Sequence, residues 1–138
     1  MTTRNYRLQQ ADAPASSMLW LLYACDAGLL VASGLIHLHL WDIAYRHVKV
    51  LDYLFLVQVA ATLVAAILLV VTRRLIIVLG SILLMAGTIV GFVLARTVGI
   101  FNFHLTFSSG LAYVVLVVEA VAVVLLTTTS ALMVRRRT

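Results

Sequence analysis

Residues 53–95 read YLFLVQVAATLVAAILLVVTRRLIIVLGSILLMAGTIVGFVLA, two long apolar runs separated by a pair of arginines. A run of about 20 apolar residues is long enough, as a helix, to cross a hydrocarbon core roughly 30 Å thick. Between the two runs the chain has only Arg73 and Arg74 in which to reverse direction. This stretch therefore predicts two antiparallel membrane-spanning helices joined by a tight turn.

The rest of the chain has the same character. Of its 138 residues, 64% are hydrophobic and 11% are charged, whereas soluble domains carry about 25% charged residues. Backbone amides inside a bilayer must find partners within their own segment, which favours helices. We predict an all-α integral membrane protein, an up-down-up-down four-helix bundle within one domain, 17–134. Its helices are expected at about 17–40, 51–72, 75–96 and 109–134, with a loosely ordered cytoplasmic tail at 1–16 and a basic cytoplasmic end at 135–138.

The basic residues indicate how the chain is oriented. The net charge is +5, but the bases sit at segment ends rather than along a soluble face, which argues against nucleic-acid binding. More of them lie at the end shared by the two termini and the Arg73-Arg74 turn than at the other end, and by the positive-inside rule this end is cytoplasmic. The excess of arginine over lysine, with abundant Ala, Val and Leu, suggests a bacterial protein and hence the inner membrane.

The segment SGLIHLHLWDIAYRH, residues 33–47, places three histidines where the first helix leaves the membrane. Imidazole is a common ligand for copper, zinc or haem iron. In a helix His37 and His39 differ by about 200°, so they would not hold one ion together. A metal site would need His37 with His47 or His104. Two other interpretations stay open: these side chains simply sit at the headgroup level, or they form a pocket for an anionic or aromatic molecule with Arg46 or Arg96 as its cation.

One acid interrupts each of the first and fourth apolar segments of the chain. Asp26 is about nine residues from the inner end of its helix and Glu119 about ten from the outer end of its own, which predicts a shared depth near mid-membrane. A carboxylate there costs at least about 2.5–3.5 kcal/mol, so each acid should face the bundle interior. Asp26, Ser33 and His37 fall on one helical face, and Gln58 with Thr62 adds a second polar stripe. The acids either form part of a proton or ligand path, or share a hydrogen bond that holds the first and fourth helices together.

The glycines indicate where helices can pack closely, and the tryptophans indicate where the membrane surfaces lie. Small residues allow transmembrane helices to approach closely, and two pairs with the right spacing are Gly28 with Ala32 and Gly87 with Gly91. Trp20 and Trp41 fall where interfacial aromatic residues are expected. The sequence holds no phosphate-binding glycine loop, nucleophile elbow or zinc-protease motif. This favours a non-enzymatic protein, although acid-base chemistry at Glu119, Asp26 or His37 stays open.

Several short motifs resemble a known pattern. HLHLW, YRH, LFLVQ and RTVGIFNF are similar to the motifs of a family of small bacterial four-helix membrane proteins without an assigned activity. The resemblance covers roughly residues 33–103. It implies that a set of residues sits together, namely His37, Tyr45, Arg46, Gly99, Phe101 and Phe103. It implies no reaction. Small multidrug transporters fit less well, because their membrane glutamate lies in the first helix.

These observations lead to three functional hypotheses. The first is a non-enzymatic subunit or accessory of a larger membrane complex, with another membrane protein or a second copy as partner and a polar pocket on the outer face. The residues expected in that pocket are His37, Tyr45, Arg46, Gln58, Arg96, Phe101 and Phe103. The second is a copper, zinc or haem protein that uses His37, His47 and His104. The third is a proton-coupled small transporter that uses Asp26 and Glu119.

Overall fold

A computed structural model describes the backbone of residues 3–99 and 110–136, and the side chains of 17–99 and 110–136. Its elements are α1 (Thr3–Leu40), the π-helical segment η1 (Trp41–Tyr45), α2 (Leu51–Thr72), α3 (Leu75–Thr97) and α4 (Gly110–Arg135). The four α-helices are long and apolar enough to cross a membrane. The all-α, four-helix prediction is therefore confirmed, and the chain has the properties of a multi-pass membrane protein.

The helix ends agree with the expected ranges to within one or two residues, except at the start of α1. Instead of a loosely ordered tail, the backbone is helical from Thr3. Residues 3–13 are mostly good helix formers such as Arg, Leu, Gln and Ala, which explains why the helix extends here. At its other end η1 continues α1 by five residues, so that the first spanning segment ends at Tyr45 rather than at Leu40.

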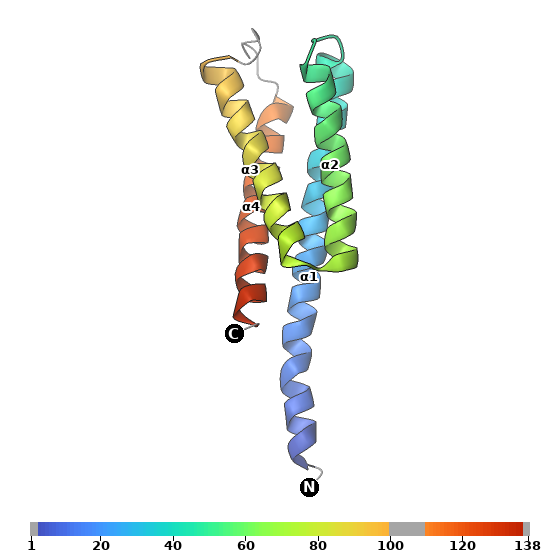
Figure 1. The fold of residues 1–138 in the computed structure, drawn as a ribbon, viewed down its shortest axis with the longest axis vertical. Helices are drawn as coiled ribbons and strands as arrows, with labels where there is room; N and C mark the ends of the chain where they lie inside the picture. Colours follow the sequence, from blue (N-terminus) through green and yellow to red (C-terminus); the bar gives the residue numbers. More distant parts are fainter. Residues whose placement is uncertain (1–2, 100–109, 137–138) are drawn as a thin grey trace.

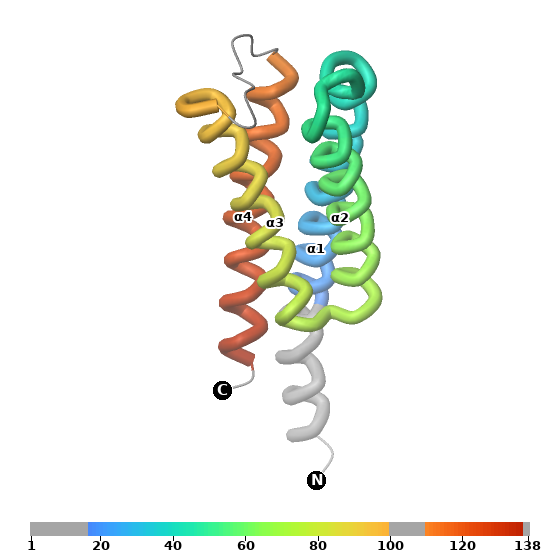
Figure 2. Tube along the Cα trace, turned by 45° about the horizontal axis from the view of Figure 1, so that its top comes forward, coloured from blue at the N-terminus to red at the C-terminus, as the bar shows by residue number. Residues whose placement is uncertain are grey.

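Consecutive helices run in opposite directions (Figure 1). Helix α1 packs against α2 and α4, and α3 packs against α4. Helices α2 and α3 meet at the two-residue turn and diverge toward the opposite end of the bundle, as the ribbon and the Cα tube both show (Figures 1 and 2). At the turn Arg73 adopts a left-handed conformation, φ 49°, and its N–H donates to the Leu69 carbonyl at 3.1 Å. The Arg73 guanidinium also lies 4.3 Å from the centroid of the Trp20 ring on α1.

The closest helix contact that a glycine permits lies between α1 and α2. A Cβ added to Gly34 would lie 2.6 Å from the Thr62 Oγ1. The prediction of close packing within the chain at Gly28, Gly87 and Gly91 is wrong for the described residues, because a Cβ on any of these would meet none of their atoms within 4 Å. Spacing alone identifies helix faces rich in small residues, but the direction in which each face points is set by the whole bundle.

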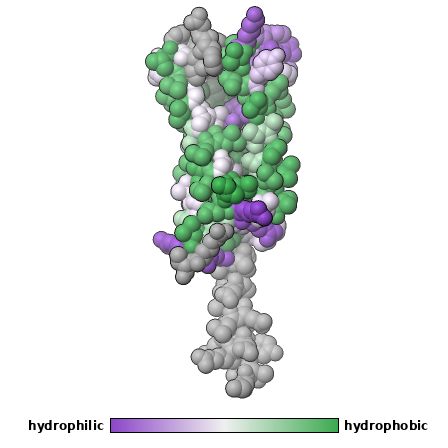
Figure 3. All heavy atoms as spheres, in the orientation of Figure 1, coloured by the Kyte–Doolittle hydropathy of each residue, from purple (hydrophilic) through white to green (hydrophobic). Residues whose placement is uncertain are grey.

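The two halves of the bundle are packed differently. The hydrophobic core lies toward the Arg73-Arg74 turn, where side chains from all four helices bury one another, among them Tyr23, Leu69, Val78 and Leu126. In the opposite half the surface is hollowed between α2 and α3 (Figure 3). The helices are thus held together firmly at one end and enclose open space at the other.

Candidate functional site

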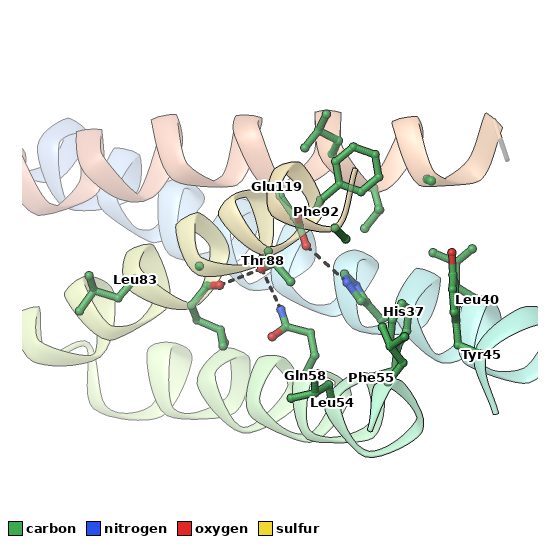
Figure 4. Close-up of a pocket in the computed structure, with 18 residues that line it drawn as sticks. His37, Leu40, Tyr45, Leu54, Phe55, Gln58, Leu83, Thr88, Phe92 and Glu119 are labelled. Atoms are coloured by element: carbon green, nitrogen blue, oxygen red, sulfur yellow. Dashed lines mark hydrogen bonds and ion pairs between the residues drawn. The ribbon is translucent and has the colours of Figure 1, made fainter. Parts of the chain in front are cut away.

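A cavity of about 430 Å³ occupies the open half of the bundle. All four helices contribute to it, and most of its lining is aliphatic or aromatic. The exceptions are four polar side chains that converge near its inner end, His37, Gln58, Thr88 and Glu119 (Figure 4). Small-molecule sites are typically apolar cavities of about 300–1,000 Å³ with a few convergent polar groups. This cavity has that form.

Glu119 is the acid of the cavity, and it is buried against α1. Its side chain is only 2% exposed. The Ser33 hydroxyl donates to Glu119 Oε1 at 3.3 Å, and His37 Nε2 lies 3.7 Å from the same oxygen. Ser33 and His37 are one helical turn apart, so both reach α4 from the same face of α1. The predicted common face of Asp26, Ser33 and His37 is confirmed, since all three are buried.

The contacts of His37 identify which ring nitrogen carries hydrogen. Nδ1 lies 2.9 Å from the Ser33 backbone carbonyl. A carbonyl oxygen can only accept, so Nδ1 is the donor and bears the hydrogen. In a neutral imidazole this leaves Nε2 as an acceptor, facing the Glu119 carboxyl. With a carboxylate facing a neutral imidazole acceptor, the pair is stable in this buried place only if it holds one further proton, on Glu119 or on His37.

The second polar contact joins α2 to α3. Gln58 Nε2 donates to Thr88 Oγ1 at 3.2 Å. The Thr88 hydroxyl in turn donates to the Leu84 carbonyl of its own helix at 2.8 Å. The Thr88 oxygen is therefore used as an acceptor. Gln58, which the sequence placed in a pocket, lines this cavity.

Aromatic rings line the part of the cavity beyond the polar groups. Tyr45 stacks on Phe55 with their ring centroids 4.6 Å apart, and Phe55 lies 5.4 Å from the His37 ring. Tyr45 comes from η1, which is tied to α2 by a hydrogen bond from the Trp41 indole to the Asp52 carboxylate. Phe92 on α3 completes the aromatic lining.

Other expected site residues lie elsewhere. Arg46 is exposed and contacts Asp42 at 3.3 Å and His47 at 3.0 Å. Arg96 is exposed in the last turn of α3. Neither arginine is among the residues that line the cavity, so the structure does not support an arginine as the cation of an anion pocket there. Phe101, Phe103 and His104 lie outside the described residues.

The histidines do not assemble a metal centre in the part of the chain that the structure describes, which holds no group of three His, Cys, Asp or Glu side chains placed to bind an ion. His37 is buried while His39 is exposed, so the expectation that they face opposite directions is confirmed. His47 is also exposed and contacts Arg46. A metal site with His104 stays a prediction.

The predicted shared depth of the two acids is wrong. Asp26 is fully buried, but its Oδ2 accepts from Thr129 at 2.7 Å, whereas Glu119 contacts Ser33. Seven residues separate Asp26 from Ser33, which is about 10 Å along the helix axis. The prediction placed Asp26 by its distance from the inner membrane surface and Glu119 by its distance from the outer one. Two similar distances from opposite surfaces do not give the same depth. The acids therefore do not bond each other, and each has its own partner across the α1–α4 contact.

Some residues of the cavity were not predicted from the sequence, namely Thr88, Phe55 and Phe92, together with two glycines that leave space in it. Gly87 and Gly91 line the cavity, and their missing side chains leave it open. One signal could have found Thr88: Ser81, Met85 and Thr88 follow the i, i+4, i+7 spacing of one helical face. Ser81 and Met85 are indeed buried.

The chain was compared with known proteins, and no protein-family model, curated protein or solved structure matches it. The resemblance to the four-helix family stays a prediction.

Proposed function

We propose that this chain is a non-enzymatic membrane protein that binds a lipid-soluble small molecule in the cavity between its four helices. The observation that carries the proposal is the combination of about 430 Å³ of mostly apolar space with a buried polar group, Glu119 with Ser33 and His37, at one end. Apolar walls hold the body of such a ligand, and the few polar groups fix its orientation.

The size of the cavity suits a compact ring system. If each heavy atom takes the ~30 Å³ share of a water molecule, the cavity holds roughly 14 heavy atoms. Divergence of α2 and α3 gives a route from the lipid, since both helices line the cavity and the surface is hollowed between them (Figure 3). A ligand dissolved in the membrane would then enter sideways.

Binding of naphthylmethanol, an uncharged fluorescent ring compound, tests this proposal on detergent-solubilised protein. Gly91→Leu should abolish binding, because the four added carbons take up roughly 120 Å³ of the cavity at ~30 Å³ per carbon. The matched control is Gly80→Leu on the same helix. A Cβ at either glycine meets no atom of the described residues within 4 Å, but Gly80 is not a cavity residue. Absence of binding, or equal binding by both variants, would reject the proposal.

We further propose that the protein lies in a bacterial inner membrane with both termini in the cytoplasm, as a small accessory of a larger complex. Exposed Arg73 and Arg74 at the α2–α3 turn, with Arg135 at the end of α4, support this orientation by the positive-inside rule. Large apolar side chains on the outside, such as Val71 at 73% exposure and Ile76 at 68%, suit contact with lipid or with a membrane partner. Labelling of a C-terminal cysteine from outside intact cells would overturn the orientation, and purification from native membranes without a stoichiometric partner would overturn the accessory role.

A further inference from the structure

We infer that the cavity selects a lipid-soluble amine in its cationic form, and that binding displaces the proton shared by His37 and Glu119. This inference rests on the proposed function and specifies the ligand class. It comes from the kind of polar atom that each side chain presents to the cavity.

The polar end of the cavity is rich in acceptors. The Nδ1 hydrogen of His37 is used by the Ser33 carbonyl at 2.9 Å, so Nε2 is the acceptor. Glu119 offers carboxylate oxygens. The Thr88 hydroxyl hydrogen is used by the Leu84 carbonyl at 2.8 Å. Gln58 adds an acceptor oxygen, and its amide donates one hydrogen to Thr88 at 3.2 Å and carries a second one. An ammonium group has only donors and therefore complements this mainly accepting set better than a carboxylate or a phosphate does.

The charged groups around the cavity also favour a cationic ligand. Among the described residues, no lysine or arginine lines the cavity, and Glu119 is its only acid. The titratable groups around Glu119 are His37 on α1 and, farther out, Tyr45 in η1; the described cavity residues of α2 and α3 have none. A buried carboxylate is stable only when it is paired. A bound ammonium group provides that pairing, and aromatic faces such as Phe55 and Phe92 attract cations.

The exchange balances in protons. Without ligand, the His37–Glu119 pair holds one proton, so the pair is neutral. When the ammonium group binds, it forms hydrogen bonds to Glu119 and to His37 Nε2, and the shared proton leaves to solvent. The net charge inside the cavity stays the same, because the bound ammonium group replaces the proton. Binding should therefore release about one proton per ligand and strengthen as pH rises, by up to about tenfold per pH unit while the pair is protonated.

Three naphthyl compounds with the same ring test this inference: naphthylmethylamine, naphthylmethanol and naphthoate. We expect the amine to bind at least about tenfold more tightly than the alcohol, the size of one charge-assisted hydrogen bond, and naphthoate to bind least. Titration calorimetry in two buffers of different ionisation enthalpy should show release of about one proton with the amine and none with the alcohol. Gly91→Leu should remove binding of both.

Glu119→Gln keeps the shape of the side chain and should abolish both the preference for the amine and the proton release, while naphthylmethanol still binds. That retained binding also shows that the variant is folded. Equal affinity for amine and alcohol in the wild type, or an amine preference that survives Glu119→Gln, would overturn the inference and leave the cavity's proposed function standing. Failure of all three compounds to bind would instead reject the proposed function itself.

Discussion

Replacement of Gly34 by alanine tests the closest contact between α1 and α2. The new Cβ would lie 2.6 Å from Thr62 Oγ1, well inside the 3.4 Å at which ordinary van der Waals contact begins. Thr62 is fully buried, and its hydroxyl donates to the Gln58 and Val59 carbonyls of its own helix, so it has little freedom to move aside. Overpacking of this kind costs about 1–3 kcal/mol. We expect Gly34→Ala to lower the free energy of unfolding by that amount.

A second substitution should reverse the effect. Thr62→Ala removes Oγ1, and the next neighbour of the new Cβ is then the Thr62 Cβ at 3.7 Å, an ordinary contact. In this background Gly34→Ala should be neutral or stabilise the protein by up to about 1 kcal/mol, the difference in helix propensity. Gly28→Ala on the same helix is the control, because no atom in the described part of the chain lies within 4 Å of its new Cβ. The assay is reversible unfolding in mixed micelles followed by circular dichroism. An equal effect of Gly34→Ala with and without the Thr62 hydroxyl would refute this reasoning.

Two further predictions concern stability. Thr129→Val removes the hydroxyl bonded to buried Asp26, whose Oδ1 already has no hydrogen-bond partner among the described residues. It should lower stability by about 1–2 kcal/mol. Thr128→Val is the control, since the exposed Thr128 hydroxyl donates to the Val124 carbonyl of its own helix, and an equal loss in both variants would contradict the account. Val50 has φ 75°, a conformation unfavourable for a β-branched residue, so Val50→Gly should raise stability by about 1–2 kcal/mol in the same assay. Lys49→Gly next to it should give no gain in stability. A gain as large as that of Val50→Gly would mean that any glycine in this loop has the effect, and would contradict the explanation by the Val50 backbone conformation.

Length and hydropathy were sufficient to predict the four membrane-spanning helices, although not the helical start of α1 at Thr3. The apolar runs on each side of Arg73 and Arg74 became α2 and α3 because a spanning segment has almost no other way to satisfy its backbone in lipid. The inward face of α1 was also predictable, since Asp26, Ser33 and His37 recur at a helical period and polar groups avoid lipid.

The cavity itself was not predictable. It depends on the divergence of α2 from α3 and on the orientation of Gly87 and Gly91, and neither property is encoded in local periodicity. The partners of the acids were missed for a related reason, because the register of α1 against α4 decides whether Glu119 meets Asp26 or Ser33. Register between helices is a property of tertiary packing, which one sequence does not reveal.

Covalent labelling in native membrane vesicles tests most directly whether lipid-soluble molecules enter the cavity. A small aryl diazirine would be partitioned into the bilayer, photolysed, and its insertion sites mapped by mass spectrometry. We predict insertion at the cavity residues Leu84 and Leu116 that is lost in Gly91→Leu, while labelling of outward-facing Val71 and Val117 persists. Insertion confined to the outward-facing residues, or labelling of Leu84 and Leu116 that Gly91→Leu leaves unchanged, would contradict the account.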